Sequence, residues 1–109
     1  MSTPHTFEPT GEWAAELGEL QQRRAQAHAM GGPEALAKFK ASGRLNARER
    51  IAALLDADSF RELGSLAGKG HYSREGLFER IDPTNAIVGT GRIQGRKVAL
   101  HVDDFTIRA

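Results

Sequence analysis

The sequence predicts an α+β fold in which a helical arm comes first and strands follow. Two observations support this fold class. Apolar residues recur at steps of three and four as far as residue 56, which is the period of a helix packed on one side. Near the end of the chain they alternate with other residues, which is the period of a strand. With 109 residues, the chain is one domain at most, or part of one.

The first helix is expected over Glu12–Met30. Its apolar stripe comprises Trp13, Leu17, Leu20, Ala27 and Met30. Gly31-Gly32 ends this helix, and the proline that follows suits the first turn of a second helix over Pro33–Ala41. Gly43 then ends the second helix.

The third helix begins at a capping box. Asn46 and Glu49 have the spacing at which each side chain accepts a hydrogen bond from the other residue's backbone N–H. The helix is expected to run to about Leu55, and its buried residues are expected to be Ile51, Leu54 and Leu55.

A short strand is expected after this helix, over Phe60–Leu63, and Gly64 ends it. A glycine-rich stretch follows, containing Gly68, Gly70 and Gly76. These glycines predict a mobile connection that extends to Pro83.

The last quarter of the chain predicts a hairpin. Its arms are Ile87–Ile93 and Arg96–Val102, and the second arm is expected to continue to Ile107. Gln94-Gly95 forms the two-residue turn, with glycine where a positive φ is needed. The second arm points one set of apolar side chains to one face: Val98, Leu100 and Val102. A lone hairpin is not stable in water, so this one must pack on another element.

These patterns divide the chain into a flexible arm, residues 1–11, and one unit over residues 12–109. Within that unit, helices occupy 12–56, and strands with the hairpin occupy 60–109. The sequence stops directly after the last strand, without a turn or a polar tail, which predicts an incomplete domain.

Composition argues against several classes of protein. The net charge of +1 gives no reason to expect binding to nucleic acid or to a membrane surface. There is no cysteine, and no apolar run approaches the roughly 18 residues of a membrane span. The first residues lack the basic start and apolar run of a secretory signal, so a cytoplasmic protein is expected.

Two patterns resemble sites but favour structural roles. Gly89, Gly91 and Gly95 are spaced one residue too widely for a dinucleotide-binding loop, and a strand follows where such a loop needs a helix. His101 and Asp103 share a strand face, but two ligands are fewer than a zinc site uses, so a solvated or paired face is expected. No metal site is predicted.

Cations gather around the start of the third helix. Arg44, Arg48 and Arg50 lie there, close to Lys38 and Lys40. Helix N-termini attract anions and arginine suits phosphate, so one interpretation is contact with a phosphate-bearing ligand. The other is a solvated helix cap with ion pairs to Glu49 or Asp56. The residues alone leave both interpretations open.

Three blocks of the sequence resemble one family. The run 43–56, GRLNARERIAALLD, with SFRE at 59–62, is similar to the signature that opens the carboxyltransferase (β) subunits of biotin-dependent acyl-CoA carboxylases, of the propionyl-CoA and methylcrotonyl-CoA carboxylase type. The lead-in at 23–35 and the hairpin blocks at 87–96 and 103–108 resemble the same subunits. Departures are small: Arg44, Asn46 and Gln94 stand where the family has Lys, Thr and Asp.

The resemblance implies the helical arm and first strands of a crotonase-like ββα superhelix. It implies transfer of a carboxyl group from carboxybiotin to the α-carbon of an acyl-CoA, with biotin held by a separate carrier domain or subunit. Expected partners are acyl-CoA, a biotin carboxylase and biotin-carrier (α) subunit, and further copies in a homo-oligomer. In the family, two oxyanion pockets made by later glycine-rich loops do the chemistry, so no catalytic residue is expected within this chain. Arg44 and Arg48 remain candidates for binding the CoA phosphates.

Two alternatives stay open. A biotin-dependent acyl-CoA decarboxylase subunit would run the same chemistry in reverse. A truncated, non-catalytic chain would instead serve as an assembly or interaction piece, docking through its helical arm and its unpaired strand edge.

Overall fold

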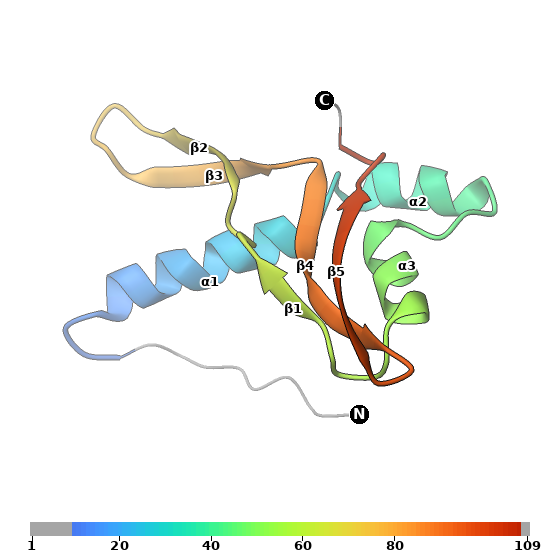
Figure 1. The fold of residues 1–109 in the computed structure, drawn as a ribbon. Coiled ribbons are helices and arrows are strands. Elements are labelled where there is room, and N and C mark those ends of the chain that lie inside the picture. The colour runs from blue at the N-terminus through green and yellow to red at the C-terminus, as the bar shows by residue number, and fades with distance from the viewer. Residues whose placement is uncertain (1–9, 108–109) are drawn as a thin grey trace.

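The computed structural model describes residues 10–107, and it has the mixed α+β architecture that the sequence predicts (Figure 1). Helices come first and strands follow. In chain order the elements are α1 (Ala14–His28), α2 (Pro33–Ala41), α3 (Ala47–Leu54), β1 (Arg61–Leu63), β2 (Gly68–Tyr72), β3 (Phe78–Pro83), β4 (Ala86–Ile93) and β5 (Arg96–Asp103). Among the described residues, no helix has both the length and the apolar character needed to cross a membrane.

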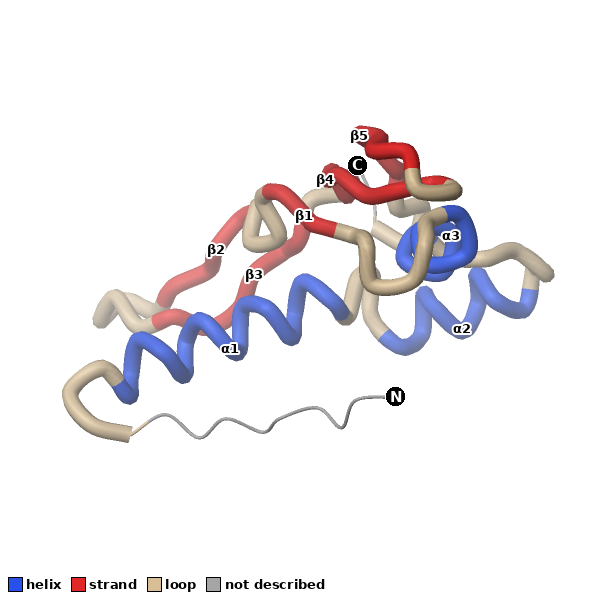
Figure 2. The backbone as a smooth tube through the Cα atoms, turned by 60° about the horizontal axis from the view of Figure 1, so that its bottom comes forward, coloured by secondary structure: helices blue, strands red, loops and turns tan. Residues whose placement is uncertain are grey.

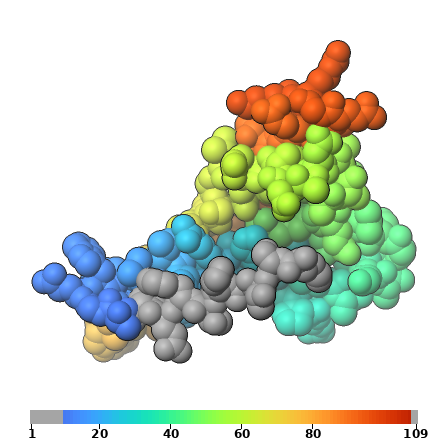
Figure 3. Space-filling view, turned by 90° about the horizontal axis from the view of Figure 1, so that it is seen from below, coloured from blue at the N-terminus to red at the C-terminus, as the bar shows by residue number. Residues whose placement is uncertain are grey.

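The strands form two antiparallel sheets. In the first, β4 lies between β1 and β5, and the second is the pair β2–β3. Figure 2 shows α1 running along β2 and β3, while α3 lies between α2 and the β4–β5 hairpin. The same succession of α2, α3 and hairpin is visible on the surface in Figure 3, from cyan through green to orange-red. The predicted need of the hairpin for a packing partner is therefore met by α3.

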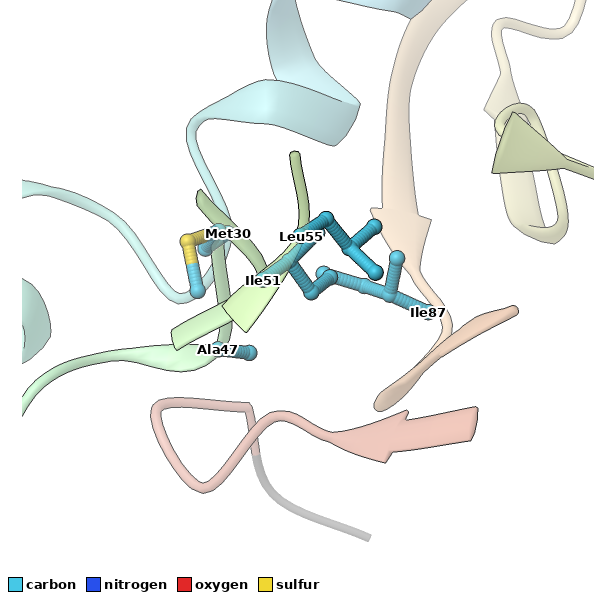
Figure 4. Close-up of a cluster of buried hydrophobic side chains, with 5 residues drawn as sticks. All are labelled: Met30, Ala47, Ile51, Leu55 and Ile87. Carbon is cyan, nitrogen blue, oxygen red and sulfur yellow. The ribbon is translucent and has the colours of Figure 1, made fainter. Parts of the chain in front are cut away.

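A small apolar core joins the helices to the central strand. Five buried side chains make up this cluster, which is shown in Figure 4: Met30, Ala47, Ile51, Leu55 and Ile87. The half-buried face of β5 packs against it with the alternation that the sequence predicts, through Val98, Leu100 and Val102. Full burial of a methionine, isoleucine or leucine side chain contributes roughly 1.5–3 kcal/mol, and the cluster holds only four of these, so the core is modest.

The helix predictions are largely confirmed, with two side chains misplaced. The second helix has the predicted bounds, whereas α1 begins at Ala14, so Trp13 precedes it and stays 68% exposed. Leu54, predicted to lie in the core, is 54% exposed: it is the last residue of α3 and lies at the edge of the buried stripe that contains Ala47 and Ile51.

The predicted capping box is present at the start of α3. The backbone N–H of Glu49 donates to Asn46 Oδ1 at 2.9 Å, and the backbone N–H of Asn46 donates to Glu49 Oε1 at 3.1 Å. We expect Asn46→Ala to lower the free energy of unfolding by about 1 kcal/mol, because the Glu49 N–H loses its acceptor. Urea denaturation measures this loss. Asn46→Asp is the control, since aspartate caps equally well, and equal midpoints for Asn46→Ala and the unmodified chain would contradict the prediction.

The β4–β5 turn has the two-residue geometry that the sequence predicts. Gln94 and Gly95 both have positive φ, 51° and 80°, as a type I′ turn requires. The Asp56 carboxylate accepts hydrogen bonds from both of their backbone N–H groups at 2.8 Å. These two bonds explain how glutamine is held in a conformation that more often selects asparagine or aspartate.

The predicted mobile connection from Gly64 to Pro83 is wrong, because most of it forms the β2–β3 hairpin. The strands are held against α1: the backbone N–H of Ile81 donates to Gln26 Oε1 at 2.7 Å, and Ile81 is buried. The Arg23 guanidinium lies 4.2 Å from the centre of the Phe78 ring and donates to the Tyr72 hydroxyl. Contacts with a distant helix, rather than local sequence, order this stretch.

The last strand ends at Asp103 and does not continue to Ile107 as predicted. Asp104 is buried, and its Oδ1 accepts hydrogen bonds from both the backbone N–H and the hydroxyl of Thr106, which turns the chain. Thr106 Oγ1 in turn accepts from the backbone N–H of Gly31 at 3.1 Å. This turn ties the end of β5 to the connection between α1 and α2. Most of the expected flexible arm, at residues 1–9, lies outside the described residues.

Candidate functional site

Arg48, one of the two predicted phosphate-binding residues, forms a bidentate ion pair with Glu62. Its Nη1 and Nη2 atoms donate to the two carboxylate oxygens at 3.1 and 3.0 Å, which joins α3 to β1. The side chains of Arg48 and Glu62 are only 21% and 16% exposed. Arg48 Nε is buried and has no hydrogen-bond partner among residues 10–107. Partial burial lowers the pKa of nearby His28, the charge of Arg48 lowers it further, and the charge of Glu62 opposes the decrease. Arg48 is therefore engaged within the fold.

Arg44 lies in a different environment. It is exposed in the connection between α2 and α3, where its guanidinium carbon lies 4.7 Å from the centre of the Phe39 ring and Nε donates to Ser42 Oγ at 3.2 Å. Lys38 and Lys40 are also exposed, on the last turn of α2. The basic residues that lie close together in the sequence therefore have two different environments. Arg48 is a structural residue paired within the fold, whereas Arg44, Lys38 and Lys40 are exposed to solvent.

An open hollow of about 670 Å³ lies between the end of α3 and the start of β1. Its polar side chains carry both signs of charge, from Arg48, Asp56, Asp58 and Arg61, over an apolar floor that includes Ile51, Leu55 and Phe60. Sequence reasoning missed this hollow. The pairing of Arg48 with Glu62 was also missed, although both residues lie in the signature blocks.

Backbone donors near the hollow are already used. The N–H groups of Gln94 and Gly95 donate to Asp56, and the N–H of Glu49 at the start of α3 donates to Asn46. An oxyanion pocket needs such donors free to face the reacting oxygen. These groups therefore do not fit the role of stabilising an enolate or the biotin ureido oxygen.

The strand glycines belong to the hairpin, as predicted, and two of them also allow close packing. A Cβ on Gly89 would lie 2.4 Å from the Arg61 carbonyl oxygen, and one on Gly91 would lie 2.5 Å from a methyl carbon of Leu55. Both residues lie within β4, so they form no nucleotide loop. His101 Nε2 lies 3.4 Å from Asp103 Oδ1, which makes the predicted paired strand face. No group of three metal-ligating side chains converges among residues 10–107.

A second ion pair lies on the β2–β3 hairpin. His71 Nε2 lies 2.6 Å from Asp82 Oδ2, and Arg80 Nε lies 3.5 Å from Oδ1. The hydrogen bond from His71 lowers the pKa of Asp82, and the charges of His71 and Arg80 add to the decrease. A carboxyl whose pKa is lower in the folded state stabilises the fold above its ordinary titration range and loses this contribution as the pH falls through the folded pKa.

We therefore expect His71→Ala to raise the pKa of Asp82 towards its ordinary value, as measured by a carboxyl ¹³C NMR titration. Arg80→Gln is the matched control and should have a smaller effect, because the His71 hydrogen bond is the largest cause of the shift. An unchanged Asp82 titration in His71→Ala would contradict this assignment.

Comparison with known proteins identifies the family. Residues 38–109 match the carboxyl transferase domain family. The chain is 41% identical over 107 residues to the biotin-dependent acetyl-/propionyl-coenzyme A carboxylase beta5 subunit of Mycobacterium tuberculosis, covering 97% of this chain and 19% of that protein. It is also 41% identical over 91 residues to the putative propionyl-CoA carboxylase beta chain of Bacillus subtilis, covering 84% of this chain and 17% of the relative.

The fold of the chain is also similar to that of a solved protein. It is similar to transcarboxylase 12S, whose structure was solved as a hexamer with methylmalonyl-coenzyme A bound, with a TM-score of 0.71 and 27% identity. That match covers 91% of this chain and 19% of the solved chain. The crotonase-like relationship predicted from the sequence is thus confirmed, and the chain spans about a fifth of the length of these relatives. This chain belongs to the carboxyl transferase domain family.

Proposed function

We propose that this chain is the opening part of a biotin-dependent carboxyltransferase, which moves a carboxyl group from carboxybiotin to the α-carbon of an acyl-CoA. The observation that carries the proposal is the family match over residues 38–109, together with 41% identity to an acetyl-/propionyl-CoA carboxylase β subunit. Biotin, carboxylated on a separate carrier domain or subunit, would supply the carboxyl group. The proposed setting is a cytoplasmic homo-oligomer that works with a biotin carboxylase and biotin-carrier subunit.

The part that this chain plays is architectural. Residues in its signature blocks stabilise the fold: Asn46 and Glu49 cap α3, Asp56 holds the hairpin turn and Glu62 anchors Arg48. We assign no step of the reaction to a side chain of residues 10–107. The two oxyanion pockets that the resemblance implies belong, in this proposal, to the remainder of the domain.

A chimera tests the proposal directly. In it, this chain replaces the aligned segment of the Mycobacterium tuberculosis beta5 subunit, to which it is 41% identical. The folded chimera is expected to carboxylate propionyl-CoA together with its biotin-bearing partner subunit. A folded and assembled chimera without transfer activity would overturn the proposal.

Within this proposal, Arg44 is the better candidate for the CoA phosphates, because it is exposed whereas Arg48 is bound to Glu62. We expect Arg44→Ala in the chimera to raise KM for propionyl-CoA about 2- to 5-fold, the loss of one solvent-exposed charge contact of roughly 0.5–1 kcal/mol. The KM for carboxybiotin should not change. Arg74→Ala, which removes an exposed arginine from the loop between β2 and β3, is the control. Equal KM values for Arg44→Ala and Arg74→Ala would contradict phosphate binding by Arg44 and favour its role in a solvated helix cap.

A further inference from the structure

Three cations lie on the face of the first sheet that is turned away from α3. Arg61 belongs to β1, Arg92 to β4 and Lys97 to β5. The register places Arg61 opposite Thr90 and Arg92 opposite Lys97, so the alternation of side chains along the strands puts all three cations on one face. The apolar side chains of β5 point to the other face and pack against the core.

Arg92 and Lys97 are two like charges at a close cross-strand position. Ile93 and Arg96 flank the two-residue turn and form a hydrogen-bonded pair, so Arg92 and Lys97 form the next, non-hydrogen-bonded pair, in which side chains lie closer together. Like charges directly opposite each other destabilise a sheet. Within residues 10–107, the ion pairs formed do not include Arg61, Arg92 or Lys97. A bound anion would remove this repulsion.

The three cations border a hollow of about 420 Å³ beside the hairpin turn. The backbone of Arg92 is held firmly there: its N–H donates to Ser59 Oγ at 3.1 Å, and its carbonyl oxygen accepts from the Asp56 N–H at 2.8 Å. Arg92 Nη1 also donates to the Gly95 carbonyl oxygen at 3.1 Å, a neutral acceptor that leaves the positive charge uncompensated. In the described part of the chain, Asp58 supplies the one carboxylate that lines the hollow.

We propose that this hollow binds a phosphate group, held by Arg61, Arg92 and Lys97. Three positive charges less the one negative charge of Asp58 leave a net charge of +2 around the hollow. A phosphate group carries about −1.5 to −2 near neutral pH and balances this charge, whereas a carboxylate would compensate only half of it. The planar guanidinium groups of the two arginines also match the oxygens of phosphate. This site does not depend on the proposed carboxyl transfer.

A titration of the chain with inorganic phosphate, followed by ¹⁵N NMR, tests the proposal. The Arg92 and Lys97 amide signals are expected to shift saturably with phosphate, and not with sodium chloride of equal ionic strength. Arg92→Gln and Lys97→Gln should each weaken the affinity for phosphate at least about 3-fold, because each removes one exposed charge contact. Arg74→Gln, at an exposed arginine in the β2–β3 loop, is the matched control and should leave the affinity unchanged.

Asp58→Asn should have the opposite effect and tighten phosphate binding about 3-fold, because it removes the negative charge from the hollow. Asp58 has a positive φ of 58°, a conformation that asparagine also adopts, so the backbone should not change. Damage to the fold cannot produce such a gain in affinity. The same affinity in the unmodified chain, Asp58→Asn and Lys97→Gln would overturn the proposal.

The chimera shows whether the site persists in a complete domain. Phosphate should raise the thermal midpoint of the chimera more than sodium chloride of equal ionic strength, because it binds the folded state. The Arg92→Gln/Lys97→Gln double variant should lose this difference. A folded chimera without the difference would show that another part of the domain occupies this face, and would overturn the proposal.

Coenzyme A is compared with inorganic phosphate in the same assay to identify the source of the phosphate group. Tighter binding of coenzyme A that is lost in the double variant would support the site and assign its ligand to a phosphate of CoA. Equal affinities, both lost in the double variant, would support a site for free phosphate. Because none of these readouts depends on catalysis, an inactive chimera that binds phosphate would count against the proposed function alone.

Discussion

Gly89→Ala is expected to lower the free energy of unfolding by about 3 kcal/mol or more, beyond the usual cost of adding one methyl group to a packed site. The new Cβ would lie 2.4 Å from the Arg61 carbonyl oxygen and 2.5 Å from a ring carbon of Phe60. Gly89 is buried in β4, which is paired on both sides, with β1 and with β5. The backbone therefore has little freedom to move away. Urea denaturation followed by circular dichroism measures the loss.

Gly18→Ala is the matched control for this substitution. Gly18 lies within α1, and a Cβ there would meet no atom of the described residues within 4 Å. Alanine is the better helix former, so this variant is expected to be more stable by about 0.5–1 kcal/mol. Changes of the same sign in the two variants would contradict the packing that we describe around β4.

Arg48→Ala is expected to lower the free energy of unfolding by about 2 kcal/mol, because it leaves the mostly buried Glu62 carboxylate without its partner. The figure is below the roughly 3–5 kcal/mol of a fully buried pair, since both side chains keep some contact with water. Glu62→Ala should have a similar effect. In the double variant the losses should not add, with a coupling energy of about 1 kcal/mol or more.

This double-mutant cycle also separates the two roles considered for Arg48. A structural arginine gives a large coupling energy with Glu62 in the absence of any ligand. An arginine kept for CoA phosphates would instead give additive losses in stability and a raised KM for acyl-CoA in the chimera. Additive stability effects would therefore contradict a structural role for Arg48.

Local chemistry made much of the fold predictable. The capping box of α3 and the two-residue turn of the β4–β5 hairpin each depend on a few neighbouring residues, and both appear as predicted. The bounds of α2 also follow from its proline and from the glycine after it. Contacts between residues far apart in the sequence could not be predicted in this way. The β2–β3 hairpin is ordered by contacts of Arg23 and Gln26 with residues more than 45 positions away.

In the candidate site, too, the contacts that could not be predicted are those between residues far apart in the sequence. The basic residues at the start of α3 were recognised, but their separation into engaged and exposed side chains depends on Glu62, 14 positions after Arg48. Asp56 likewise stabilises a turn 38 and 39 positions away. In both cases a charged side chain that looked available in the sequence is committed to a partner that only the tertiary fold brings near.

The rate of carboxyl transfer to propionyl-CoA tests the central claim most directly. It should be measured for three samples with the same biotin-bearing partner: the chimera, the Mycobacterium tuberculosis subunit lacking the aligned segment, and this chain alone. We predict transfer by the chimera and none by the other two, because this chain supplies structure and the remainder of the domain supplies the reacting groups. Transfer by the chain alone, or an assembled chimera without activity, would contradict this division of roles.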